Sequence, residues 1–107
     1  MTLADLSENK QNQVCAALGR SLKALRIHAE KSQEVLAFEA EVDRTYISAI
    51  ERGIANPSLM TLASLCYALN VNMSVLFAPV QYNAPPGDNK RANKAKPTLK
   101  PAKSRLR

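Results

Sequence analysis

The 107-residue sequence lacks the features on which several classes of protein depend. No apolar run approaches the roughly 18 residues of a membrane-spanning helix, so we expect a soluble globular protein. The first ten residues, MTLADLSENK, have neither the basic start nor the apolar core of a secretory signal. We therefore expect a cytoplasmic location. A chain of this length is expected to form about one domain with a modest core.

Residues suited to metal binding or catalysis are also scarce. The single histidine, His28, has no ligand-type residues at suitable spacing, so we predict no metal site and a surface position near a helix end. The two cysteines, Cys15 and Cys66, lie among alanines and leucines and are interpreted as small, reduced core residues. No nucleophile–base combination, glycine-rich phosphate loop or clustered carboxylate pair is recognisable. We therefore predict no enzyme, no cofactor and no small-molecule ligand.

Charge divides the chain into two parts. Residues 1–82 contain seven basic and eight acidic residues, whereas residues 83–107 contain eight basic residues and one aspartate. The second part, NAPPGDNKRANKAKPTLKPAKSRLR, has four prolines and only two large apolar residues, so we expect a disordered polycation. Attraction to nucleic-acid phosphates and a solubilising role without a specific partner are both open for this tail.

Helical periodicity dominates the remainder, and no stretch has sustained strand alternation. An apolar stripe predicts a first helix from about Lys10 to Ala29, which leaves residues 1–9 as an N-terminal extension; the stripe consists of Val14, Leu18, Leu22 and Leu25. Ser32 is a suitable N-cap for a second, short helix. Its apolar residues are Val35, Leu36, Ala37 and Ala40.

A third helix is predicted directly after the second. Asp43 is its N-cap, and we expect the carboxylate to accept the backbone N–H of Tyr46. Ile47 and Ile50 form its buried stripe, and Gly53 ends it by adopting positive φ.

Two more helices complete a five-helix, all-α domain over residues 10–82. The turn Asn56-Pro57-Ser58 precedes a fourth helix from about Leu59 to Leu69, whose stripe is Leu62, Leu65, Cys66 and Leu69. The last helix is short, is expected to be capped by Asn72 and is stopped by Pro79. Its apolar residues are Val75, Leu76 and Phe77.

The second and third helices are short, are joined by about three residues and follow a longer helix. This order is typical of a helix-turn-helix, whose second short helix projects its outer face. With Ile47 and Ile50 inward, a turn of 100° per residue places the following residues outward: Thr45, Ser48, Ala49 and Arg52, with Arg44 at the tip. This small, polar face with an arginine at each end suits the major groove of DNA.

The chain from Arg20 to Phe77 also resembles the lambda repressor/Cro-like (XRE-type) helix-turn-helix domain. The resemblance lies in LRIHAEKSQEVLA, VDRTYISAIERGIANPS and LASLCYALNV. It implies four base-reading residues: Arg44, Thr45, Ser48 and Ala49. It implies contacts to the DNA backbone from Gln33, which also braces the recognition helix, and from Tyr46, Arg52, Asn56 and Ser58. It further implies an ion pair between Arg26 and Glu51 that fixes the recognition helix on the first helix.

Glu41 departs from the pattern of this family, which often has glycine in the turn. A glutamate with left-handed backbone would carry strain of about 1 kcal/mol, so the geometry of the turn is open. The stretch VDRTYISAIERG also resembles restriction–modification controller proteins, which are small dimeric members of the family. Antitoxin repressors use similar domains, and neighbouring genes would decide between these roles.

The combined prediction is a sequence-specific DNA-binding transcriptional regulator, a repressor or autoregulator, acting as a homodimer on double-stranded DNA. The dimer interface is expected among Val75, Leu76, Phe77, Val80 and Tyr82, although these residues, Leu76 and Phe77 above all, can instead close the monomer core. The alternative is a protein-interaction adaptor or antitoxin-type module whose basic tail binds nucleic acid without sequence preference. The slightly acidic body and three glutamates near the predicted DNA face favour it: Glu34, Glu39 and Glu41.

Overall fold

The computed structural model describes residues 3–84, with side chains from residue 13 onward. This part contains five α-helices and no strand: α1 (Leu3–His28), α2 (Gln33–Ala40), α3 (Arg44–Glu51), α4 (Leu59–Leu69) and α5 (Met73–Phe77). The predicted all-α fold with five helices is therefore confirmed. The predicted disordered tail lies outside the described residues, apart from its first two. Within residues 3–84, none of the helices has the length and apolar character that crossing a membrane requires.

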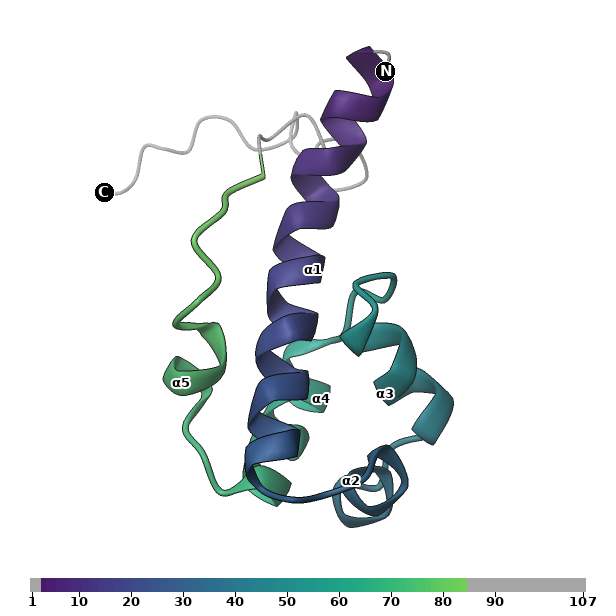
Figure 1. Cartoon of the computed structure of the whole chain (residues 1–107), viewed down its shortest axis with the longest axis vertical. Coiled ribbons are helices and arrows are strands. Elements are labelled where there is room, and N and C mark those ends of the chain that lie inside the picture. The colour runs from purple at the N-terminus through teal and green to yellow at the C-terminus, as the bar shows by residue number, and fades with distance from the viewer. Residues whose placement is uncertain (1–2, 85–107) are drawn as a thin grey trace, which may run out of the picture.

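Helix α1, with 26 residues, is the longest of the five described helices. It contacts α3 and α5, while α2 contacts α3 and α4, and α4 also contacts α5. In Figure 1, α3 lies on one side of α1 and α5 on the other, and the N-terminal half of α1 extends beyond α2 and α3. The helices therefore surround only the C-terminal half of α1.

The start of α1 differs from the prediction. The helix begins at Leu3 and not near Lys10, so residues 3–9, expected to be an extension, are part of it. No glycine or proline occurs before Gly19, and alanine, leucine, glutamate, lysine and glutamine all favour helix. The apolar stripe therefore indicated where α1 is covered by other helices, and helix propensity accounts for its greater length.

The core lies between the C-terminal half of α1 and the four shorter helices, all of which contribute residues to it. Among residues 13–84, six large side chains are fully buried: Leu22, Leu36, Ile47, Ile50, Leu65 and Leu76. Burying one such side chain contributes about 1.5–3 kcal/mol. The Ser21 hydroxyl donates to the Leu76 carbonyl oxygen at 2.7 Å, which joins α1 to α5 inside this core.

Several expected core residues lie elsewhere. Cys66 is buried as predicted, but Cys15 is half-buried and lines a pocket together with the loop after α3. Val35, Val75 and Phe77 are exposed. Only one face of each short helix packs against the core, and the neighbouring Leu36 and Leu76 occupy that face. His28 is exposed at the end of α1, as predicted.

Residues with left-handed backbone follow α1, α2, α3 and α4; besides Gly53 these are Glu30, Glu41 and Asn70. Glu41 has φ 57° after α2, and Asn70 has φ 58° after α4. The Val42 N–H donates to the Ala37 carbonyl oxygen at 2.9 Å across the first of these turns. Glu41 thus adopts the conformation for which glycine is the least strained residue.

The cap of α5 also differs from the prediction. Asn72 occupies the N-cap position, but its side chain makes no capping bond. Its backbone carbonyl oxygen instead accepts the N–H groups of Val75 and Leu76, at 3.0 and 3.4 Å. A helix of five residues is held here by its own backbone and by the burial of Leu76.

Candidate nucleic-acid interface

Helix α3 presents one apolar face and one polar face. Ile47 and Ile50 are 0% and 1% exposed against the core. The structure brings the residues of the predicted outer face together on the opposite side; Arg44, Thr45 and Arg52 are exposed, and Ser48 and Ala49 are half-buried. A neighbouring surface must therefore enter between the two arginines to contact Ser48 and Ala49.

The N-terminus of α3 is capped by Asp43, with a different partner from the one predicted. Its Oδ1 accepts the Thr45 N–H at 2.9 Å and the Thr45 hydroxyl at 2.8 Å, whereas the Tyr46 N–H bonds to the Asp43 carbonyl oxygen. The two bonds from Thr45 lower the pKa of the Asp43 carboxyl. The Thr45 hydroxyl already donates to Asp43, so its oxygen is available to a ligand as an acceptor.

The C-terminus of α3 is fixed by the ion pair that the family resemblance implied. Arg26 Nε lies 2.6 Å from Glu51 Oε2, and Arg26 Nη2 donates to Glu51 Oε1 at 3.0 Å. The two side chains are 11% and 4% exposed. Arg26 Nη1 also donates to the Lys31 carbonyl oxygen at 2.9 Å, so this arginine holds both α3 and the α1–α2 turn. A bidentate, charge-assisted pair of this kind is strong and directional.

Burial and the neighbouring polar groups shift the pKa of Glu51 in opposite directions. Burial raises the pKa of the carboxyl, but hydrogen bonds from Arg26 and Gln33, with the positive charge of Arg26, outweigh it. The pKa of Glu51 is therefore lowered, and the carboxylate form is favoured in the folded protein.

Gln33 connects this buried pair to the exposed end of α3. Its Nε2 donates to Glu51 Oε1 at 2.9 Å, and its Oε1 accepts Arg44 Nη1 at 3.1 Å. Four side chains therefore form one relay in the order Arg26, Glu51, Gln33, Arg44, which we call the Arg26–Arg44 relay. The relay joins α1, α2 and α3, and it orients Arg44 through an uncharged amide.

Two glycines allow α3 to end directly on α1. A Cβ at Gly19 would lie 2.2 Å from the Ile50 carbonyl oxygen, and a Cβ at Gly53 would lie 2.9 Å from Ala16 Cα. Gly53 also has φ 79°, as predicted from its position. Gly19 was missed by the sequence analysis. Its signal was a glycine inside a long helical stretch, where it costs about 1 kcal/mol relative to alanine unless packing requires it.

The residues expected to contact the DNA backbone surround α3. Arg52, Asn56 and Ser58 are exposed, and Gln33 and Tyr46 are half-buried. Ser58 has a second role, because its Oγ caps α4 by accepting the Thr61 N–H at 3.1 Å.

The family model for helix-turn-helix proteins matches residues 22–76, which include α2, α3 and α4. The chain belongs to the helix-turn-helix family. It is similar to control protein C.MunI of a Mycoplasma species, with 37% identity over 71 residues that cover 65% of this chain and 96% of that protein. All residues of the Arg26–Arg44 relay lie within the region matched by the family model.

Two solved structures of this helix-turn-helix class resemble the protein closely enough to compare folds. The restriction-modification controller protein C.AhdI from Aeromonas hydrophila has 38% identity and a TM-score of 0.58, and the match covers 59% of this chain and 96% of that one. A second is the C.Esp1396I controller tetramer in complex with its natural 35 base-pair operator. It has 32% identity and a TM-score of 0.57, and the match covers 61% of this chain and 86% of that one.

Proposed function

We propose that this helix-turn-helix protein is a transcriptional regulator that binds double-stranded DNA in a sequence-specific way, with α3 in the major groove. One observation carries the proposal: the polar face of α3 is exposed, while the helix is fixed on α1 through a buried, bidentate ion pair. The controller proteins to which the chain is similar support the same role. The proposed activity is binding and not catalysis.

Arg44 is the principal base-reading residue in this proposal. Its guanidinium can bond to guanine O6 and N7 together. The bond from Arg44 Nη1 to Gln33 Oε1 restricts the side chain before DNA binds. Thr45, Ser48 and Ala49 complete the proposed base contacts through a hydroxyl acceptor, a hydroxyl and a methyl group.

Gln33 is suited to contact DNA and brace α3 at once. Its amide nitrogen has two hydrogens, of which one is used by Glu51, so the second can donate to a phosphate oxygen. Tyr46, Arg52, Asn56 and Ser58 are the other proposed backbone contacts, and they position the helix without selecting a sequence.

We further propose a homodimer, with an interface that includes Val75, Phe77 and Tyr82. These side chains are 44%, 38% and 43% exposed beside the fully buried Leu76, which closes the monomer core. A twofold dimer would contact two half-sites about 34 Å apart. Sedimentation at tens of micromolar protein should show a dimer; a monomer there would contradict dimerisation in free solution.

The specific role that we propose is that of a controller, acting as a repressor or autoregulator. Its support is the similarity to control and restriction-modification controller proteins. The protein should then bind DNA immediately upstream of its own coding sequence with higher affinity than DNA from within that sequence. Equal affinity for the two fragments would argue against autoregulation.

Selection of bound sequences from a random duplex library tests the DNA-binding proposal. The full chain should enrich one motif at about 150 mM salt, where exposed charges are largely screened. Arg44→Ala should degrade that motif at a defined base pair. Arg44→Lys should do the same, because lysine keeps the charge but lacks the bidentate geometry. An unenriched pool, with binding only at low salt, would contradict sequence-specific binding by α3.

A further inference from the structure

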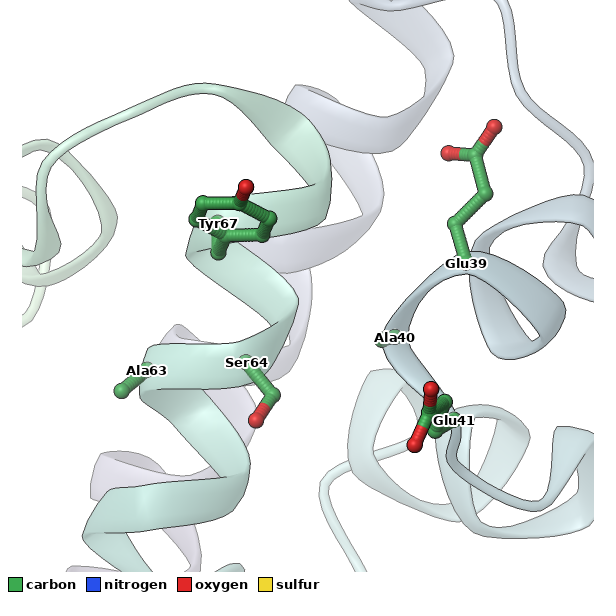
Figure 2. Close-up of a pocket in the computed structure, with 6 residues that line it drawn as sticks. All are labelled: Glu39, Ala40, Glu41, Ala63, Ser64 and Tyr67. Carbon is green, nitrogen blue, oxygen red and sulfur yellow. The ribbon is translucent and has the colours of Figure 1, made fainter.

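A shallow groove lies between the C-terminal end of α2 and the middle of α4. Its volume is about 350 Å³, and its walls are formed by Glu39, Ala40, Glu41, Ala63, Ser64 and Tyr67. Figure 2 shows Glu39 and Glu41 on the α2 side and Ser64 and Tyr67 on the α4 side. None of the residues proposed to contact DNA lines this groove. We call it the α2–α4 groove.

The chemistry of the α2–α4 groove is acidic and aromatic. Tyr67 is 88% exposed, and Phe38, next to Glu39 on α2, is 84% exposed. Both rings therefore present apolar surface that is available to a partner. Lysine and arginine bind to the faces of such rings, and their long apolar stems pack against them.

One lysine of the described chain, Lys31, already binds to a glutamate of the groove. Lys31 Nζ pairs with Glu39 Oε1 and donates to the Ala68 carbonyl oxygen of α4 at 2.7 Å. No cation pairs with Glu41 among the side chains of residues 13–84. The groove therefore has a carboxylate left for a further cation.

We propose that the α2–α4 groove is the docking site of the chain's own basic C-terminal segment, residues 85–107. This segment has eight lysines and arginines, one aspartate and four prolines, in stretches such as KPTLKPAK. Its charge complements the unpaired Glu41 carboxylate, and prolines dock on exposed aromatic rings. Groove and segment thus match both in charge and in apolar groups.

The length of the segment permits the contact. The structure describes the chain up to Ala84, and 23 residues follow. Fully extended, they span about 75 Å, more than the 49 Å longest dimension of the molecule. The segment is therefore long enough to span the distance from Ala84 to the groove.

Docking would give the basic segment two competing partners. In the free protein the Glu41 carboxylate of the groove neutralises part of its charge, and phosphates of a nucleic acid compete for the same lysines and arginines. The contact itself requires no DNA. It is therefore measured without DNA and stands or falls separately from the proposed function.

Amide NMR shifts of the full ¹⁵N-labelled chain test the docking. The wild type is compared with a tail-neutral variant of the same length, in which all eight basic residues of 85–107 are glutamine. At about 50 mM salt the two should differ at the amides of residues 39–41 and 63–67. At about 500 mM salt, screening should remove the difference.

Two groove variants and a matched control locate the contact. Combining Glu39→Gln with Glu41→Gln should reduce the tail-dependent shifts about threefold or more, since it removes the unpaired Glu41 carboxylate and leaves the Lys31 ammonium beside the groove without its Glu39 partner. Tyr67→Ala should also reduce them without changing the charge. Glu30→Gln removes one exposed charge outside the groove and should leave them intact.

Three results would overturn the proposal. Groove amides that do not respond to neutralising the tail would show that the segment binds elsewhere or not at all. If Glu30→Gln reduced the tail-dependent shifts as much as the Glu39→Gln/Glu41→Gln double variant, the segment would be attracted to the body as a whole and not to the groove. Shifts that grow with protein concentration would assign the groove to the segment of a second copy.

Discussion

The two ends of α3 are held in different ways. The C-terminal end, with Ile50, Glu51 and Gly53, is packed against α1 and paired with Arg26. The N-terminal end, with Arg44 and Thr45, is exposed and held by its Asp43 cap and by one bond to Gln33. One end thus sets the position of the helix and the other presents it to a partner. Variants at the two ends should separate stability from recognition.

The largest effect is expected at the buried end, from Glu51→Ala. It leaves the Arg26 guanidinium, 11% exposed, without its charge partner. Removing one partner of a buried pair costs about 3–5 kcal/mol, so the midpoint of thermal unfolding should fall by about 15 °C or more. Glu34→Ala, at an exposed position of α2, is the control and should change the midpoint little. An unchanged midpoint for Glu51→Ala would show that the pair contributes as little as a surface pair.

The same pair predicts how stability depends on pH. The pKa of Glu51 is lowered on folding, so its stabilisation is complete above the ordinary glutamate value of about 4.3 and is lost as pH falls through the lowered value. The stability difference between wild type and Glu51→Gln should therefore be constant near neutral pH and shrink in acid. Urea unfolding at several pH values measures it. A difference that grows as pH falls would have the wrong sign for a lowered pKa.

The next effect tests the close packing of α1 on α3. Gly19→Ala should improve helix propensity but destabilise the protein by about 1–3 kcal/mol, since the new methyl overlaps the Ile50 carbonyl oxygen. The reverse change at an exposed α1 position, Ala24→Gly, should cost only about 1 kcal/mol through propensity. Chemical denaturation compares the two. A stabilised Gly19→Ala variant would mean that α1 and α3 are not in such close contact.

Gln33→Ala tests the connection between the two ends. We expect a stability loss of about 1 kcal/mol from the missing hydrogen bonds and a fall of about tenfold in affinity for the selected DNA as Arg44 loses its orientation. Arg44→Ala should lower affinity by a similar or larger factor and leave stability nearly unchanged. If Gln33 acts through Arg44, the loss of binding free energy in the double variant Gln33→Ala/Arg44→Ala will be smaller than the sum of the two single losses. Additive losses would mean that Gln33 acts on DNA independently.

The smallest effect is expected away from both ends, at Glu41. Its φ of 57° suits glycine, so Glu41→Gly should stabilise the protein by up to about 1 kcal/mol. Asn70→Gly, at φ 58°, is the matched control and should gain less, because asparagine tolerates this conformation better. Thermal unfolding measures both. Marked destabilisation by Glu41→Gly would show that the glutamate side chain contributes more than its backbone strain costs.

Much of the fold could be predicted from local signals. Apolar periodicity and caps located all five helices, and the spacing of Ile47 and Ile50 gave the outer face of α3. The beginning of α1, the core position of Cys15 and the alternative core position of Phe77 were predicted wrongly, because periodicity describes a single helix and not what covers it. The bond that the Thr45 N–H donates to Asp43 was missed, because a cap can accept either of two neighbouring N–H groups.

The sequence by itself determined the order of the helices, the two faces of α3 and the separation of the basic segment from a nearly neutral body. These features depend on residues one to seven positions apart, or on composition. The family resemblance implied the Arg26–Glu51 pair. Only the tertiary structure decided the fit of Gly19 against Ile50, the bonds of Gln33 to Glu51 and Arg44, and the groove between α2 and α4. Arg26 and Glu51 are 25 residues apart, and Gln33 and Glu51 are 18 apart. No local pattern specifies which atoms meet across such separations, because that depends on how whole helices pack.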